Sequence, residues 1–181
     1  MMKKIAFISL IILSLSFVAF GQKSKVAAEK AAAIQAAADE KAVRTAFEDL
    51  LTGIRNSNVD GVTGVYWNSA KTLYYNSNGS ITIGWEQDRK NREARYPKIS
   101  NVKLDVRNVV VMMLGKEGAL ITCQWKQTQD FEANPESASG RMTLVFKKIG
   151  KDWKIVHLHT SPDLPKADRP VMPSEKVGKD N

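Results

Sequence analysis

The chain has 181 residues, a length that allows one ordinary domain with extensions at its ends. It carries 27 Lys and Arg against 19 Asp and Glu, but the basic residues are spread along the chain without a basic block or a run interleaved with aromatics. The composition therefore does not favour a nucleic-acid-binding protein, and we expect no nucleic-acid partner. A single cysteine, Cys123, excludes an intramolecular disulfide, and its apolar neighbours predict a buried, unreactive thiol.

The first residues have the pattern of an export signal. The basic residues Lys3 and Lys4 precede an apolar run over residues 5–20, and small residues at Ala19 and Gly21 match a cleavage site before Gln22. The apolar run is shorter than the roughly 20 residues that a membrane-spanning helix needs, which argues against the alternative of an uncleaved anchor. We therefore expect residues 1–21 to be a removed signal peptide, and the mature protein to be periplasmic or secreted, without a stable membrane anchor.

Two helical segments are expected next. Residues 22–40 are rich in alanine and have high helix propensity but almost nothing large to bury, so they predict an exposed helical lead-in. A new pattern starts at Val43, where apolar residues recur at helical spacing and predict the first core helix, ending near Asn56. The residues of this apolar stripe are Val43, Phe47, Leu50, Leu51 and Ile54.

A short helix, a hairpin and a third helix follow. Asn58 can cap a second, short helix through Tyr66, and two β-prone runs flank Asn78-Gly79, which predicts a tight hairpin. A third helix is predicted from Trp85 to Arg95, stopped by Pro97. One face of it carries Trp85, Arg89, Arg92 and Tyr96. Its two arginines either extend to the rim or point into a cavity that needs positive charge.

After Pro97 the pattern changes to four long strands, which we place at residues 103–114, 119–129, 141–148 and 153–161. Residues 132–139 are rich in Asn, Pro, Glu and Ser and predict a loop. The polar residues 164–181 predict a disordered tail. The fold class is thus α+β, with three helices packed in a strongly curved, mixed or antiparallel sheet that forms a cone with one pocket.

Several segments resemble the SnoaL-like branch of the nuclear transport factor 2-like superfamily, which includes ketosteroid isomerase and the calcium/calmodulin-dependent kinase association domain. The matching segments are "NVDGVTGVYW", "SNGSITIGWEQ", "RYP", "SGRMTLVFKKIGKDWKIVH" and the closing "HTS". The resemblance implies a cone-shaped domain over residues 41–163. It does not imply one activity, because this fold carries enzymes, carriers and assembly modules.

The resemblance does not supply a catalytic carboxylate. Enzymes of the superfamily use an acidic base or an Asp–His arrangement inside the cone, whereas Leu158 stands where similar sequences often have an acidic residue. Arg89 and Arg92 stand where relatives tend to have apolar or aromatic residues, and Asp105 and Asp130 match no catalytic pattern. The histidines are then the main candidates for acid–base chemistry.

The only two histidines, His157 and His159, lie in the last predicted strand. Strict alternation places them on one face with Trp153 and Ile155, and places Val156 and Leu158 among the residues of the other face. We interpret the histidine face as cavity lining. We interpret the other face as a surface covered by a second copy, because similar proteins often dimerise through the sheet.

Three roles for the histidine pair remain open: a metal half-site, catalysis with His159 as general acid or base, and hydrogen bonding to a ligand. The chain has no third histidine and no Asp or Glu at a short fixed spacing on that strand, so we expect no metal and no cofactor. An aromatic cavity that holds an arginine and two imidazoles suits a flat or acidic organic molecule. The candidate ligand-binding residues are Tyr75, Trp85, Arg92, Tyr96, Trp125, Arg141, His157 and His159.

Three functions follow from these features. The first is an exported homodimer that binds a small organic ligand, whose identity the sequence does not reveal. The second is an enzyme of the isomerase, cyclase or dehydratase kind that uses His159. The third is a non-catalytic dimeric assembly module, in which the pocket has no role. The shape of the pocket distinguishes them, since an assembly module needs no open cavity.

Overall fold

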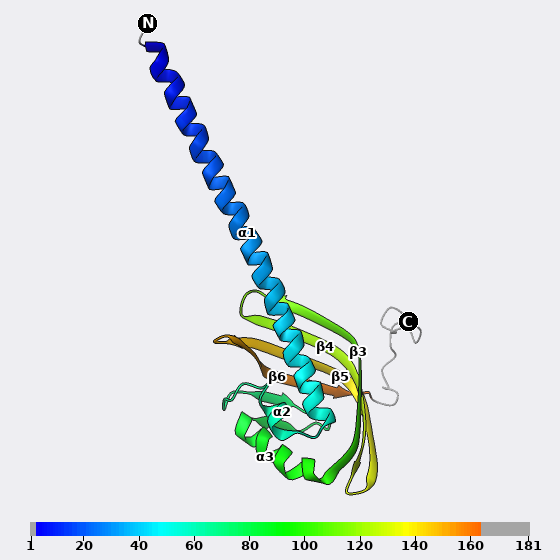
Figure 1. Ribbon diagram of the computed structural model, residues 1–181. Helices are drawn as coiled ribbons and strands as arrows, with labels where there is room; N and C mark the ends of the chain where they lie inside the picture. The colour runs from blue at the N-terminus through cyan, green and yellow to red at the C-terminus, as the bar shows by residue number, and fades with distance from the viewer. Residues whose placement is uncertain (1–2, 164–181) are drawn as a thin grey trace. The chain divides into compact units, whose positions relative to one another are not determined.

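The computed structural model describes residues 3–163, with side chains from Lys25 onward (Figure 1). The chain divides into two compact units, residues 1–45 and 46–181. The tail predicted at residues 164–181 lies outside the described residues. Within the part of the chain that is described, no helix is both long and apolar enough to cross a membrane.

The first helix, α1 (Lys3–Arg55), joins the predicted lead-in and the predicted core helix into one element. Residues 22–52 contain neither glycine nor proline, so nothing in this stretch ends the helix. Residues 25–38 are exposed, as expected for an alanine-rich segment. The predicted apolar stripe is buried at Phe47, Leu50 and Leu51, and this end of α1 forms part of the core of the second unit.

The second helix, α2 (Val59–Thr63), is shorter than predicted. Asn58 caps it as expected, because its side chain accepts a hydrogen bond of 3.0 Å from the backbone nitrogen of Gly61. The helix does not continue to Tyr66, because the backbone there pairs with a strand: Trp67 donates to the carbonyl of Ile155 at 2.9 Å. A parallel bridge between Tyr66 and Ile155 continues this pairing.

The predicted hairpin is present as β1 (Leu73–Tyr75) and β2 (Ile81–Ile83). Its connection is longer than the two residues expected, since the last pair is Tyr75 with Ile81. Gly79 has a φ of 82°, which explains the glycine in this turn. The third helix, α3 (Trp85–Arg95), has the predicted bounds and is followed by the short 3-10 turn η1 (Tyr96–Lys98).

Four long strands complete a six-stranded sheet in the order β2-β1-β6-β5-β4-β3. They are β3 (Ile99–Leu114), β4 (Gly118–Phe131), β5 (Asn134–Ile149) and β6 (Asp152–Pro162). β1 pairs in parallel with β6, whereas the other neighbouring pairs are antiparallel, so the sheet is mixed. The sheet curves and remains open, with β2 and β3 as its edges, which confirms the predicted α+β class (Figure 1).

The loop predicted over residues 132–139 is wrong. β5 begins at Asn134, and Ser139 already pairs with Lys126 of β4. The turn consists of Glu132 and Ala133 alone, with φ angles of 49° and 68°. Such a turn is usually signalled by Asn or Gly, and neither occupies it here, so composition pointed to a loop instead. A 2.7 Å ion pair between Glu132 and Lys98 connects the turn to η1.

The predicted facing of the last strand is also wrong beyond its middle. Ile155 pairs with Phe146, but the next residue of β5, Val145, pairs with His157, so β6 contains one extra residue at Val156. This β-bulge shifts the alternation by one position. Leu158 therefore faces the inside, where it is buried, and the histidines face the outside.

Candidate functional site

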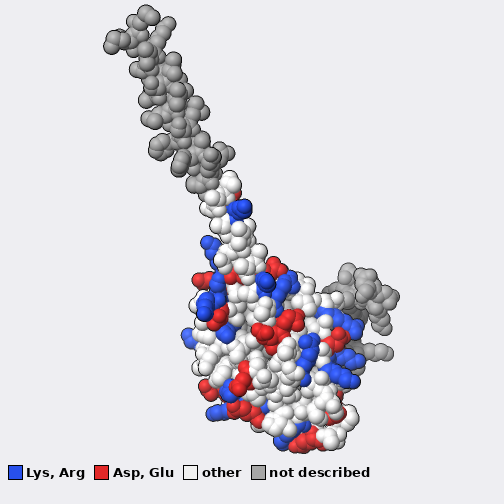
Figure 2. All heavy atoms as spheres, in the orientation of Figure 1, with Lys and Arg blue, Asp and Glu red and all other residues white. Residues whose placement is uncertain are grey.

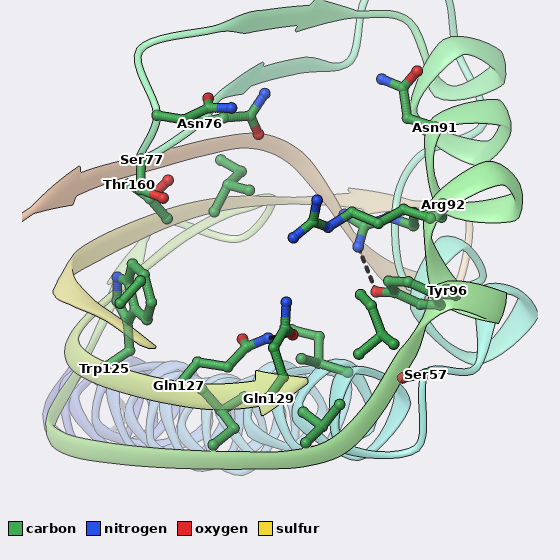
Figure 3. A pocket seen from close by; sticks show the side chains of 18 of the residues that line it. Ser57, Asn76, Ser77, Asn91, Arg92, Tyr96, Trp125, Gln127, Gln129 and Thr160 are labelled. Carbon is green, nitrogen blue, oxygen red and sulfur yellow. Dashed lines mark hydrogen bonds between the residues drawn. The ribbon is translucent and has the colours of Figure 1, made fainter. Parts of the chain in front are cut away.

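The cone of the second unit encloses a cavity of about 740 Å³. α1, α3, the β1–β2 hairpin and strands β3 to β6 all contribute to its wall, and Figure 3 shows α3 facing β4 across it. Apolar side chains from several elements form much of the surface. They are Leu50, Ile54, Ile99, Val102, Leu104, Met142 and Leu158.

Arg92 reaches into this cavity from α3 and is held from two sides (Figure 3). Its Nε donates to Asp88 Oδ2 at 2.8 Å, and its Nη1 donates to the hydroxyl of Tyr96 at 2.7 Å. The guanidinium also lies 5.9 Å from the ring centre of Tyr66. Because the side chains of Arg92 and Asp88 are only 17% and 9% exposed, this ion pair is largely removed from water.

Burial and charge set the protonation of the groups around Arg92. Burial acts to lower the pKa of Arg92, but its neighbours Tyr96 and Asp88 outweigh burial, so the pKa lies above its ordinary value. Burial raises the pKa of Tyr66 and Tyr74, and the charge of Asp88 raises both further, although Arg92 opposes the shift. Arg92 is therefore a permanent cation, and both tyrosines stay neutral.

A chain of amides lies on the opposite wall. Gln127 and Gln129 of β4 line the cavity, and Gln127 Nε2 donates to Gln129 Oε1 at 2.6 Å. Gln129 Nε2 donates to Glu136 Oε2 at 2.8 Å, and Arg95 forms an ion pair of 2.8 Å with the same oxygen. This series of hydrogen bonds thus runs from the cavity to a half-exposed ion pair at the cavity rim.

Three of the predicted ligand-binding residues line this cavity: Arg92, Tyr96 and Trp125. Of the two roles considered for Arg92, the one that points into the cavity is the one observed. Trp125 belongs to β4 and lies across the cavity from α3 (Figure 3). Its indole Nε1 is buried without a hydrogen-bond partner in the described part of the chain.

His157, His159 and Tyr75 do not line the cavity, which corrects the predicted cavity facing of these residues. They form an aromatic cluster, in which the ring of Tyr75 stands edge-on to both imidazoles at centroid distances of 5.4 Å and 5.6 Å. His157 Nδ1 lies 3.1 Å from the carbonyl oxygen of Leu73, which connects β6 to β1. The two histidines face outward because the bulge at Val156 reverses which side chains of β6 face the cavity beyond that residue.

Trp85 and Arg141 also lie outside the cavity lining. The indole of Trp85 donates to the carbonyl of Thr63 at 2.8 Å and is covered by Arg89, so it fastens α3 to α2. Arg89 itself pairs with Asp60 at 2.8 Å. Arg141 is exposed on β5, where it pairs with Ser161 on the outer side of the sheet.

The functional residues that sequence reasoning missed are polar ones. Asp88 precedes Arg92 by one helical turn, a spacing that signals an ion pair, but the sequence does not show that the pair is buried. Gln127 and Gln129 follow Trp125 at intervals of two residues and share its face of β4, so a period-2 reading of β4 could have found them. Glu136 was hidden in the wrongly predicted loop.

The electrostatics of the site are balanced. Both carboxylates of the lining, Asp88 and Glu136, are engaged in ion pairs with Arg92 and Arg95. Among the residues with described side chains, no group of three or more His, Cys, Asp or Glu is placed to hold a metal ion. Cys123 is buried, as predicted, and burial raises its thiol pKa to about 11. Acidic and basic side chains are interspersed on the outer surface seen in Figure 2.

Comparison with known proteins gives a family and a fold. The SnoaL-like domain family matches residues 43–165, whereas no curated protein matches the chain. A nuclear transport factor 2-like superfamily protein from Salmonella enterica serovar Typhimurium has a TM-score of 0.66 at 19% identity, over 74% of this chain and 96% of that one.

Two further solved structures have the same fold. A nuclear transport factor 2-like protein of unknown function in nutrient uptake from Rhodospirillum rubrum has a TM-score of 0.58 at 16% identity, over 67% of this chain and 98% of that one. A type 2 hexachlorocyclohexane dehydrochlorinase has a TM-score of 0.63 at 12% identity, over 77% and 97%. At these identities the likeness shows the fold alone.

Proposed function

The chain belongs to the SnoaL-like domain family, and from this premise we propose that it is an exported protein that binds a small organic ligand in its cone. The observation that carries the proposal is the open cavity of about 740 Å³ with a fixed cation on one wall and amides on the other. Cavities of a few hundred to about 1,000 Å³ with apolar walls and a few placed polar groups are typical of small-molecule sites.

The arrangement of charged groups supports binding over acid–base catalysis. Asp88 accepts from Arg92 and Glu136 accepts from Arg95, so each lining carboxylate is already engaged in an ion pair. A general base has to lie within hydrogen-bond reach of the proton that it takes, and one oxygen of each of these carboxylates is already directed at an arginine. His159, the residue on which the enzyme alternative relies, does not line the cavity. The dehydrochlorinase among the similar structures is an enzyme, but its likeness to this chain concerns the fold.

Export remains part of the proposal and depends on the first residues. The basic start, the apolar run and the small residues before Gln22 support a cleaved signal. Mass mapping of the N-terminus of protein secreted from a host that processes such signals should find Gln22 as the first residue. Retention of Lys3 on the exported protein would contradict this part of the proposal.

The homodimer also remains a proposal, with a different surface. Leu158 cannot form the contact as first expected, because it faces the interior. Large apolar side chains are instead exposed at both edges of the sheet, on β2 and β3, and exposed apolar groups of this size favour a covered surface. They are Ile81, Ile83, Val110, Met112 and Leu114.

The central test is native mass spectrometry of the protein purified without refolding. The wild-type protein should retain a small molecule, and Arg92→Met should lose it, because the variant removes the cation inside the cavity. Arg89→Met is the matched control, since Arg89 lies on the same helix but does not line the cavity. Tyr96→Phe should weaken retention without a change in charge. Equal retention by wild type, Arg92→Met and Tyr96→Phe would place the ligand elsewhere and refute the site.

A further inference from the structure

We propose that the rim ion pair Arg95–Glu136 sets the direction of hydrogen bonding in the cavity, so that the site selects a flat molecule with an acceptor at one end and a donor at the other. The acceptor, a carboxylate or carbonyl, meets Arg92, and the donor, a hydroxyl or N–H, meets Gln127. This inference rests on the proposed function, because it names the class of ligand for the same site.

The direction begins at Glu136, because an ionised carboxylate accepts hydrogen bonds and cannot donate them. Its Oε2 accepts from Arg95 Nη2 at 2.8 Å in an ion pair. The same oxygen lies 2.8 Å from the side-chain amide of Gln129. The amide nitrogen of Gln129 must therefore point at Glu136, and its carbonyl oxygen must point away.

The direction passes from Gln129 to Gln127. The carbonyl oxygen of Gln129 accepts from Gln127 Nε2 at 2.6 Å, so the nitrogen of Gln127 is also directed along the chain. Gln127 Oε1 then remains as an acceptor at the cavity wall, and within residues 25–163 no side chain or backbone group donates to it. A bound molecule that places a hydroxyl or N–H there would satisfy this oxygen, whereas a second acceptor would be repelled.

The opposite wall has the complementary polarity. Asp88 takes the Nε of Arg92 and Tyr96 takes its Nη1, so Nη2 keeps its two donors without a partner in the described residues. Figure 3 shows the guanidinium directed into the cavity, across from Gln127 and Gln129. A carboxylate or carbonyl of the ligand would accept from it.

The lining also contains apolar side chains and one large flat ring. Leu104, Met142 and Leu158 contribute aliphatic surface, and the indole of Trp125 lies on β4 beside Gln127. Aromatic rings favour other flat rings in offset or edge-on contact. An aromatic hydroxy acid or hydroxy amide therefore matches the donor, the acceptor and the flat ring of the lining.

The test compares 4-hydroxybenzoate with 4-methoxybenzoate by isothermal titration calorimetry. The two probes share the ring and the carboxylate, but the methoxy group cannot donate a hydrogen bond and adds one methyl group. Wild-type protein should bind the hydroxy compound about tenfold more tightly, the ratio expected for one buried hydrogen bond. Gln127→Leu should abolish this preference. Glu136→Gln should also reduce it to less than about twofold, because a glutamine at position 136 can donate as well as accept and no longer fixes the amides.

The matched control is Glu132→Gln. Glu132 precedes Glu136 by four residues and also pairs with a basic side chain, Lys98 at 2.7 Å, but it does not line the cavity. This control should keep the tenfold preference. In a ligand-free NMR spectrum, the side-chain amide resonances of Gln127 should shift in Glu136→Gln and stay in place in Glu132→Gln.

Two results would overturn the inference while leaving the proposed function intact. One is equal affinity of the wild type for both probes, and the other is an undiminished preference in Glu136→Gln. If neither probe binds to wild type while native mass spectrometry still detects a retained molecule, the ligand class is wrong and the binding function stands. If nothing is retained and neither probe binds, both fail together. Should Glu136→Gln not fold, Gln127→Leu and the NMR comparison decide.

Discussion

Replacing Asp88 by Asn removes the negative charge that Arg92 faces while it keeps the shape of the side chain. In the native protein the two side chains are 2.8 Å apart and are 9% and 17% exposed. In the variant, the guanidinium of Arg92 remains in a low-dielectric wall, and its hydrogen-bond partners there are the Tyr96 hydroxyl and a neutral amide. Stability should therefore fall, because Arg92 cannot lose its proton to relieve the burial of its charge.

The size of the loss follows from the burial of the pair. Removing one partner of a fully buried ion pair costs about 3–5 kcal/mol. Arg92 borders a cavity, so water can reach part of its guanidinium, and the new amide can still accept one hydrogen bond. We expect a decrease of about 2–3 kcal/mol in the free energy of unfolding. With a urea m-value of about 2 kcal/mol/M, the midpoint should fall by about 1–1.5 M.

Urea unfolding followed by tryptophan fluorescence measures this midpoint, and an unchanged m-value shows that the variant still unfolds as one unit. Glu93→Gln is the control, because Arg89–Glu93 is also an i, i+4 pair on α3 but is more exposed, and Arg89 keeps Asp60 as a second partner. Glu93→Gln should leave the midpoint where the wild type has it. If Asp88→Asn loses no more than Glu93→Gln, Arg92 is not held by a buried charge, and the account of this wall is wrong.

Three further results are expected. Val110 and Met112 are 56% and 52% exposed on β3, and replacing both by Lys should convert a dimer to a monomer in light scattering. A wild-type protein that is already monomeric at micromolar concentration would refute the proposed dimer. His157→Ala should lower the free energy of unfolding by about 1 kcal/mol in thermal melts, because it loses a hydrogen bond to a backbone carbonyl. His159→Ala should change this free energy little. A larger loss of stability in His159→Ala than in His157→Ala would contradict the outward facing of the two histidines on β6. Cys123, with a thiol pKa of about 11, is protonated at pH 8, so a disulfide reagent should label the native protein far more slowly than the urea-unfolded protein. The labelling rate of the native protein should rise as the pH approaches 11. Equal labelling rates in the native and unfolded states would show an accessible thiolate.

Local signals predicted much of the fold. α3 has the predicted bounds, because Gly84 precedes it and Pro97 follows it closely, and both act within a few residues. The four long strands lie where period-2 patterns placed them, and the structure extends them by one to seven residues at every end except that of β3, which ends at Leu114 as predicted. The apolar stripe of α1 is buried as its helical spacing indicated.

The features that escaped prediction depend on pairing between distant segments. The bulge at Val156 arises because Ile155 and His157 pair with two consecutive residues of β5, which leaves Val156 unpaired. A valine does not signal such a bulge in the sequence. The turn at Glu132 and Ala133 has no glycine, so it is specified by the strands it joins. Of the candidate site residues, Arg92, Tyr96 and Trp125 line the cavity, whereas the histidines lie outside it because strict alternation does not allow for the bulge.

The extra residue at Val156 also determines which of two sets of side chains the last strand offers to the cavity. Leu158 and Thr160 are now inside, and the imidazoles of His157 and His159 are outside. If the downstream half of the strand slipped by one position, the bulge would disappear and the two sets would exchange places. In that register the imidazoles of His157 and His159 would line the cavity. A shift in strand register would thus change the side chains that the last strand presents to the cavity, without replacing any residue.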